Sequence, residues 1–263
     1  MSDRRQRQKE QRAAKRETEK KQAARKELGR RLITALGFGV VVVTVFALSG
    51  VFSGESTELP GSYEGFRSQP TACGADQPPP EQIMSFEAFE PQSDVTATSN
   101  VTATLATSCG EIVMELDPAS SPETVNSFVF LAREGFFDGQ VFHRIVEAFV
   151  IQGGDPEANG TGGPGYAIAD EFPTSPDFVY EMGFVAMANR GAGSTGSQFF
   201  FVIGDDARFL TPSFNVLGKV VSGQDALERI VEVPKGVSPG SREKSLPLET
   251  VYIESVTIDV TDS

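Results

Sequence analysis

The sequence predicts a mainly β protein: an antiparallel β-barrel capped by two helices, preceded by a single transmembrane helix and a flexible linker. Three observations carry this prediction. The C-terminal part alternates apolar and polar residues in many short segments and has two helical patterns. A long uncharged segment precedes it, and a stretch rich in Gly, Ser, Pro and acidic residues joins the two. The expected boundaries are 1–31 for a basic tail, 32–54 for the transmembrane helix, 55–100 for the linker and 101–261 for the folded domain.

The segment Leu32–Gly54 contains no charged residue. An α-helix needs roughly 20 apolar residues to cross a bilayer, whereas the apolar part of a signal peptide has about 7–15. No small-x-small cleavage pattern follows, so we expect a retained signal-anchor, with a cleaved signal as the alternative. Positively charged flanks stay in the cytoplasm. The basic tail therefore predicts a single-pass protein of the cell membrane, with a cytoplasmic N-terminus and an extracytoplasmic C-terminal domain.

Charge is divided unevenly along the chain. Met1–Arg31 carries thirteen Lys/Arg and five Asp/Glu, a net charge of +8, which leaves ten Lys/Arg and 31 Asp/Glu, a net charge of −21, for the rest. A basic tail of this kind binds either nucleic acid or anionic lipid headgroups. We expect membrane lipid and no nucleic acid as its partner, because the same charges already account for the topology.

The linker composition, including Gln77-Pro78-Pro79-Pro80, is typical of an extended chain that buries little apolar surface. Ser85–Pro91 (SFEAFEP) could pack on the domain, though nothing in the sequence requires it. The two cysteines, Cys73 in the linker and Cys109 in the domain, both follow the apolar segment. In an oxidising compartment they are a candidate disulfide, and two unpaired thiols are the alternative.

The domain opens with a predicted hairpin, in which Val101–Leu105 and Ile112–Leu116 alternate apolar and polar residues around a turn. Ser121 and Pro122 indicate the start of a helix, and Gly135 its end. Further strands are expected at Phe184–Met187, Phe199–Val202, Val216–Val221 and Val251–Val260, a second helix at Asp225–Val231, and loops at Asn159–Gly165, Arg190–Ser197 and Pro234–Pro247.

The stretch Phe142–Asp155 (FHRIVEAFVIQGGD) places one cation, Arg144, and one amide, Gln152, among closely spaced apolar residues. Its first residues alternate as in a strand that shows one face to the barrel and the other to a groove. A cation and an amide beside an apolar surface are typical of a site that binds peptide and acts without a covalent step.

Five motifs occur in one order along the domain: FHRIVEAFVIQGGD, GTGGPGY, MANRG, GSQFF and LGKVVSG. In these motifs the chain resembles the cyclophilin family of peptidyl-prolyl isomerases, over roughly Val101 to Asp259. The resemblance implies a closed eight-stranded antiparallel barrel with two helices and an active groove on its outer surface. It also implies that the substrates are proline-containing polypeptides, the exported client proteins of a folding catalyst.

The resemblance carries site roles to particular positions. Arg144 matches the catalytic arginine. The positions that match the proline pocket and its rim are Phe149, Val150, Phe200, Leu210 and Phe214. Those that match the groove holding the substrate backbone are Gln152, Ala188, Asn189 and Gln198. The chain departs from the family at Val150, where Met is more usual, at Phe214, where relatives often carry His or Tyr, and at Phe209, where many have Trp.

Isomerisation of an X-Pro bond requires a cation near the prolyl nitrogen and no other chemical group. Rotation about an X-Pro bond breaks amide resonance and localises a lone pair on the prolyl nitrogen, which a guanidinium stabilises best in the twisted state. No cofactor, metal or nucleophile is called for, and we expect His143, Asp170-Glu171 and Asp205-Asp206 to have no catalytic role. The alternative from another class is a non-catalytic module, tethered to the membrane, that holds proline-containing segments in the same groove.

Overall fold

The structure, a computed structural model, describes residues 61–238 and 241–262. The expected basic tail (1–31) and transmembrane segment (32–54) lie outside these residues and stay predictions. Among the described residues, no helix is both long and apolar enough to span a bilayer.

One antiparallel sheet of eight strands forms the framework of the domain, in the order β10-β1-β2-β7-β5-β6-β4-β3. Buried and more exposed residues alternate along β1, so that Val101, Ala103 and Leu105 face the core. The strands are β1 Ser99–Thr107, β2 Gly110–Leu116, β3 Arg144–Val146, β4 Val150–Gly153, β5 Phe184–Met187, β6 Phe199–Val202, β7 Val216–Ser222 and β10 Ile253–Asp262.

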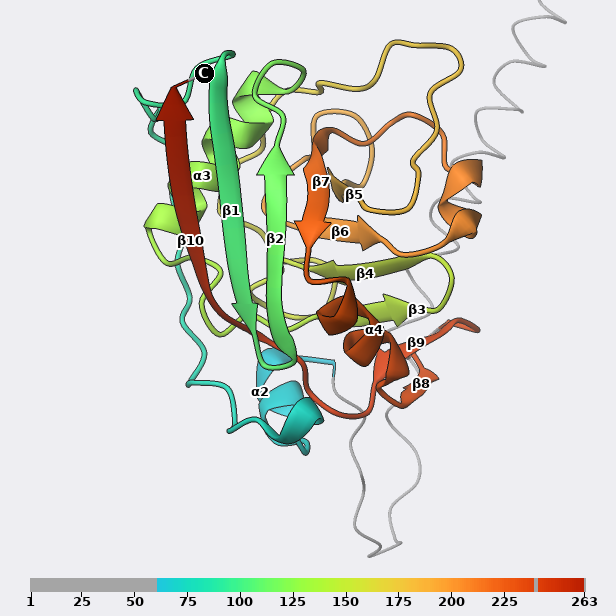
Figure 1. Ribbon diagram of the computed structural model, residues 1–263. Coiled ribbons are helices and arrows are strands. Elements are labelled where there is room, and N and C mark those ends of the chain that lie inside the picture. The colour runs from blue at the N-terminus through green and yellow to red at the C-terminus, as the bar shows by residue number, and fades with distance from the viewer. Residues whose placement is uncertain (1–60, 239–240, 263) are drawn as a thin grey trace, which may run out of the picture. The chain divides into compact units, whose positions relative to one another are not determined.

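The sheet curls but does not close, which corrects the expected closed barrel. In Figure 1 the long strands β10, β1 and β2 run steeply across the view while β6, β4 and β3 run nearly at right angles to them. The two edge strands, β3 and β10, do not pair. An isolated bridge joins Val141, before β3, to Tyr252, before β10. Strand β3 has only three residues and pairs with β4 alone, so the contact does not extend into a ladder with β10.

Two helices cover the sheet, as expected. Helix α3 (Pro122–Arg133) packs against β10 and β7, and α4 (Gln224–Glu232) against β2 and β3. Phenylalanine rings fill the space beneath α3: Phe128 stacks on Phe137 at a centroid distance of 4.9 Å, and Phe199 meets both rings edge-on. The deepest part of the core is therefore aromatic.

The start of α3 is capped from a distance. Ser121 makes no side-chain cap hydrogen bond. The carboxylate of Glu171 instead accepts from the backbone N–H groups of Glu123 and Thr124, at 3.0 and 2.8 Å, and from the Thr124 hydroxyl. Glu171 thus satisfies amides that a helix start leaves unpaired.

Residues 61–98, assigned to a flexible linker, pack on the domain. Helix α2 (Tyr63–Arg67) buries Tyr63 and Phe66, and the Tyr63 hydroxyl lies 2.9 Å from the carbonyl oxygens of Pro79 and Gly139. Phe86 lies edge-on against Phe130 of α3. A few well-placed aromatic residues therefore override a composition poor in apolar side chains.

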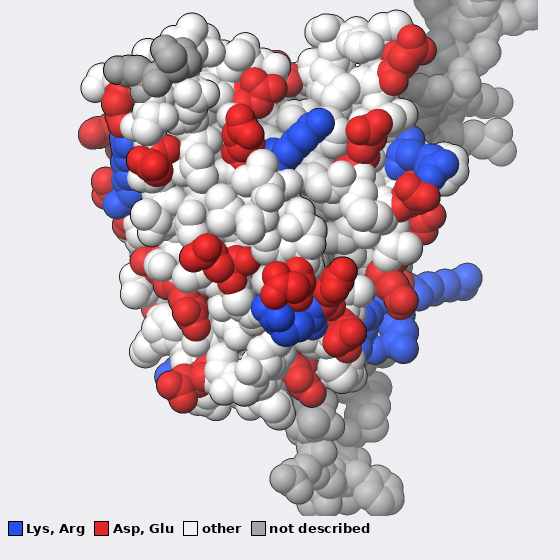
Figure 2. Space-filling model, in the orientation of Figure 1, with Lys and Arg blue, Asp and Glu red and all other residues white. Residues whose placement is uncertain are grey.

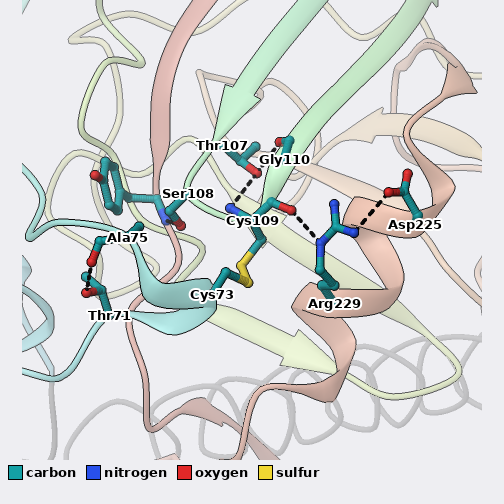
Figure 3. Close-up of a disulfide and its surroundings, with 10 residues drawn as sticks. Thr71, Cys73, Ala75, Thr107, Ser108, Cys109, Gly110, Asp225 and Arg229 are labelled. Atoms are coloured by element: carbon teal, nitrogen blue, oxygen red, sulfur yellow. Dashed lines mark hydrogen bonds and ion pairs between the residues drawn. A yellow bond between two sulfur atoms is a disulfide. The ribbon is translucent and has the colours of Figure 1, made fainter.

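Cys73 and Cys109 form a disulfide that ties this N-terminal segment to the turn between β1 and β2. Cys73 lies in the short 3-10 helix η1 (Ala72–Gly74). Figure 3 shows the bond beside α4, where Arg229 donates from Nε to the Cys109 carbonyl oxygen at 2.8 Å and pairs with Asp225.

The segment 234–247, expected as a loop, contains a small hairpin. Strands β8 (Lys235–Val237) and β9 (Lys244–Pro247) pair antiparallel, and β9 lies against β3. Leu246, almost fully buried, anchors the hairpin to the body of the domain. We call the described residues of this segment, 235–238 and 241–247, the β8–β9 hairpin.

Candidate active site

Sheet register brings the central polar residues into one row. Arg144 on β3 lies opposite Gln152 on β4, and Gln152 lies opposite Phe200 on β6. Residues directly opposite one another in a sheet point to the same face. The cation, the amide and an aromatic ring therefore stand side by side, as the alternation in the sequence predicted.

The end of β4 depends on a close backbone approach. Gly154 has a φ of 78°, and a Cβ at this position would meet the carbonyl oxygen of Ser197 at 2.4 Å. Glycine is the residue that tolerates both conditions. The contact brings the chain just before β6, including Gln198, against the end of the β4 strand.

A cavity of about 270 Å³ opens beside this row. Every residue that the resemblance assigned to the site lines it, with the exception of Gln198. The lining residues are Arg144, Phe149, Val150, Gln152, Ala188, Asn189, Phe200, Leu210 and Phe214. The expected residues, spread over seventy positions of sequence, thus converge on one hollow.

Gln198 lines a neighbouring cavity of about 570 Å³ instead, which shares Gln152, Ala188 and Asn189 with the first. A chain of hydrogen bonds connects the two: Arg144 Nη1 donates to Gln152 Oε1 at 3.3 Å, and Gln152 Nε2 to Gln198 Oε1 at 3.0 Å. Gln198 Nε2 in turn donates to the carbonyl oxygen of Gly162 at 2.9 Å. The polar side of the groove is continuous from one cavity to the other.

The apolar side of the smaller cavity is rigidly packed. Phe200 is 4 % exposed and meets Phe214 edge-on at 5.5 Å. Tyr180, which the sequence did not single out, is buried beneath both rings and contacts the Phe214 backbone through its hydroxyl. Burial raises the pKa of Tyr180 to about 12, so this hydroxyl keeps its proton.

Arg144 is half-buried and points into the cavity. Its guanidinium lies 5.6 Å from the centre of the Phe149 ring. Glu243, in the β8–β9 hairpin, accepts hydrogen bonds from Nε and Nη2, both at 2.7 Å. These bonds hold the pKa of Glu243 below its usual range, against the effect of burial. No local sequence signal marks Glu243, because 99 positions separate it from Arg144.

Two neighbours of the site lie outside the cavity. Phe209, where relatives often have Trp, is 81 % exposed in the 3-10 helix η2 (Asp205–Phe209). His143 is buried, and desolvation lowers its pKa to about 4, with Arg144 adding to the shift and Asp155 opposing it. Within residues 61–238 and 241–262, no cluster of three His, Cys, Asp or Glu side chains could hold a metal ion.

A curled antiparallel sheet with a cation-and-amide groove beside an aromatic hollow defines a protein that acts on extended peptide. The chain belongs to the family described as cyclophilin type peptidyl-prolyl cis-trans isomerase/CLD, whose family model matches residues 102–258. The resemblance seen in the sequence is thereby confirmed, and the chain is a peptidyl-prolyl cis-trans isomerase.

Two isomerases and one solved isomerase structure are similar to this chain. The chain is 41 % identical over 172 residues to peptidyl-prolyl cis-trans isomerase B of Streptomyces anulatus, covering 60 % of this chain and 95 % of that protein. It is 37 % identical over 180 residues to peptidyl-prolyl cis-trans isomerase A of Mycobacterium tuberculosis, covering 61 % and 93 %. A solved cyclophilin type isomerase of Cryptosporidium parvum matches with a TM-score of 0.54 at 26 % identity, over 61 % of this chain and 98 % of its own. The same protein was solved in the presence of the dipeptide Ala-Pro.

Proposed function

We propose that this isomerase accelerates X-Pro rotation in exported client polypeptides, with Arg144 as the catalytic residue. Residues 32–54 hold the isomerase at the outer side of a cell membrane. The observation that carries the role of Arg144 is the cavity, which has a guanidinium on one wall and apolar rings on the others. The apolar side suits a prolyl ring, and the similar Cryptosporidium protein was solved in the presence of the dipeptide Ala-Pro.

Arg144 acts on the nitrogen of the bond that rotates. In the planar amide the nitrogen lone pair is delocalised and accepts no hydrogen bond, whereas in the twisted state it does. A donor from the guanidinium therefore binds the twisted state more tightly than either planar isomer, and that difference accelerates rotation. Arginine suits the task because it stays protonated and offers donors in a fixed fork.

The remaining residues hold the substrate so that only one side rotates. Phe200, Leu210 and Phe214 exclude water from the prolyl ring, which strengthens the contact with the guanidinium. Gln152 and Asn189 present amides to the neighbouring peptide. Uncatalysed exchange takes roughly tens to hundreds of seconds, and shortening it to milliseconds requires lowering the barrier by about 5–7 kcal/mol. One charge-assisted hydrogen bond together with fixed orientation of the substrate is of that order.

Membrane attachment rests on the sequence of residues 1–54. The face of the domain in Figure 2 carries many acidic and few basic side chains, which does not suit binding to anionic headgroups. Attachment is therefore assigned to the apolar segment and the basic tail.

The test of the catalytic role uses the full chain in detergent micelles and a proline-containing tetrapeptide. Arg144→Ala is expected to lower kcat/KM by at least a hundredfold, and Arg144→Lys, which keeps the charge without the fork, by at least tenfold. A wild-type rate equal to the uncatalysed rate, or an Arg144→Ala variant with full activity, would refute the assignment. Tight binding of the peptide with no acceleration would instead favour the non-catalytic module.

The test of location is protease treatment of intact cells. The C-terminal domain is expected to be degraded from outside, while a tag placed before Met1 stays protected. Protection of the domain, or its recovery in the soluble fraction of the cells, would refute the proposed topology.

A further inference from the structure

The β8–β9 hairpin delivers a carboxylate to the catalytic arginine. Glu243 Oε2 accepts from Arg144 Nε and Oε1 accepts from Nη2, each at 2.7 Å. Paired, parallel N–H···O bonds of this kind fix the plane of a guanidinium as well as its position. A single hydrogen bond would leave that plane free to rotate.

The hairpin is built to hold Glu243 in place. Its backbone N–H donates to Ser241 Oγ at 2.9 Å, and its carbonyl oxygen accepts from the Ser238 N–H at 3.2 Å. The Ser238 and Ser245 hydroxyls bond each other across the hairpin at 2.9 Å, and Ser245 is 1 % exposed. Both sides of Glu243 are therefore tied, and its carboxylate is presented from a fixed backbone.

The pair leaves part of the guanidinium free for substrate. Arginine has five N–H donors. Glu243 takes one on Nε and one on Nη2, and Gln152 takes one on Nη1, so one remains on each of Nη1 and Nη2. Arg144 lines the smaller cavity and Glu243 does not. The carboxylate therefore holds the guanidinium from outside the cavity and does not occupy the place of a substrate.

Two effects of Glu243 oppose each other. Its negative charge weakens the attraction between the guanidinium and the prolyl nitrogen. Its two hydrogen bonds, on the other hand, hold the Arg144 side chain in one orientation, so that this side chain loses no rotational freedom when substrate binds. The Arg144 and Glu243 side chains are 28 % and 37 % exposed, so water screens the charge effect. Orientation is not screened, and we therefore expect it to be the larger effect.

We propose that Glu243 is a positioning residue of this isomerase, which orients Arg144 so that its two free donors face the rotating X-Pro bond. The inference rests on the proposed catalytic role of Arg144. It extends the active site to a hairpin that lies outside the five motifs by which the family resemblance was recognised.

The first test measures kcat and KM separately for the full chain in micelles. Glu243→Gln and Glu243→Ala are each expected to lower kcat about three- to tenfold with KM within twofold of wild type. Glu243→Asp keeps the charge but has a shorter side chain, so its kcat is expected to be close to that of Glu243→Gln and Glu243→Ala. Glu232→Gln, the same change at an exposed site on α4 away from the cavity, serves as the control and is expected to behave as wild type.

The second test does not depend on activity. In a 15N–1H spectrum, the Nε–Hε signal of Arg144, identified by its loss in Arg144→Lys, is expected to be shifted and protected from solvent exchange in wild type. In Glu243→Ala it should move to the position of exposed arginines, and in Glu232→Gln it should not move. A signal indifferent to Glu243→Ala, kcat within twofold of wild type in both Glu243→Gln and Glu243→Ala, or a kcat that rises, would overturn the proposal. If Arg144→Ala is fully active while the signal responds, the role of Arg144 fails and the pairing stands.

Discussion

Tyr180 and Phe214 exchange two hydrogen bonds at the rim of the smaller cavity. The Tyr180 hydroxyl donates to the Phe214 carbonyl oxygen at 2.7 Å and accepts from the Phe214 N–H at 3.0 Å. Phe214 itself follows a short exposed turn and has no strand to hold it. One buried hydroxyl therefore fixes the backbone of a residue that lines the proline pocket.

Tyr180→Phe is expected to loosen this rim. It leaves a donor and an acceptor of Phe214 without partners, at a cost of about 1–3 kcal/mol in the free energy of unfolding. Because Phe214 then contacts the prolyl ring less regularly, KM for a tetrapeptide should rise roughly threefold to tenfold. Urea unfolding and steady-state kinetics measure the two effects.

Tyr63→Phe is the matched control. Tyr63 is also buried with its hydroxyl bonded to backbone carbonyls, but it lies in α2 and does not line the cavity. It should lower stability and leave KM unchanged. Equal KM values for the two variants would contradict the role given to Tyr180.

The disulfide between Cys73 and Cys109 should contribute to stability and not to catalysis. It closes a loop with a sequence separation of 36, for which the chain-entropy account gives up to about 4 kcal/mol. A Cys73→Ser/Cys109→Ser double variant is therefore expected to lose about 2–4 kcal/mol in urea unfolding while keeping kcat/KM, since neither cysteine lines the cavity. Wild type in reductant should behave in the same way, and an unchanged unfolding midpoint in both would contradict the prediction.

The long strands β1 and β2 were predictable because each buries one face, which imposes alternation on residues close in sequence. Residues 61–98 were not, because their packing depends on few residues, such as Tyr63 and Phe86, within an otherwise polar composition. The gap between β3 and β10 was missed for a related reason. Strand closure depends on whether two distant segments reach one another, and no pattern local to Arg144–Val146 records it.

The candidate site also contains residues that a local sequence pattern reveals and residues that only a distant contact reveals. Arg144, Gln152 and Phe200 are visible in sequence because short motifs surround them. Glu243 and Tyr180 are not, because each acts through a contact with a residue far along the chain, at 99 and 34 positions. An acid in a Pro/Gly/Ser-rich loop has the sequence pattern of an ordinary solvated residue.

His143 should make the free energy of unfolding depend on pH between about 6.5 and 4. Burial lowers its pKa from 6.5 to about 4 in the folded protein. Below pH 6.5 the unfolded chain takes up a proton that the folded protein does not, so stability falls as pH falls, and the loss levels off near pH 4. The total is about 3 kcal/mol.

Unfolding of wild type and of His143→Gln, compared between pH 6.5 and 4.5, measures this effect. The chain has a single histidine, so the substitution removes the imidazole contribution completely while the carboxylates titrate in both proteins. Wild type should show the steeper loss. Parallel pH profiles would mean that folding does not lower the pKa of His143.

Phe209, where relatives often carry Trp, is expected to weaken the binding of cyclosporin, the cyclic-peptide inhibitor of the cyclophilin family. The ring is 81 % exposed next to Leu210, which lines the cavity, but it has no donor to offer a bound peptide. Phe209→Trp adds an indole N–H, and one hydrogen bond of about 1 kcal/mol should tighten cyclosporin binding about fivefold to tenfold. Phe209→Leu, which removes the ring, should bind it no better than wild type.

Calorimetric titration of all three proteins gives the comparison. Because the natural chain has no Trp, the emission of the introduced indole also reports binding directly in Phe209→Trp. Turnover of a tetrapeptide should stay within twofold of wild type, since position 209 does not line the cavity that holds the prolyl ring. Wild-type affinity equal to that of Phe209→Trp would show that the inhibitor is held by contacts other than this donor.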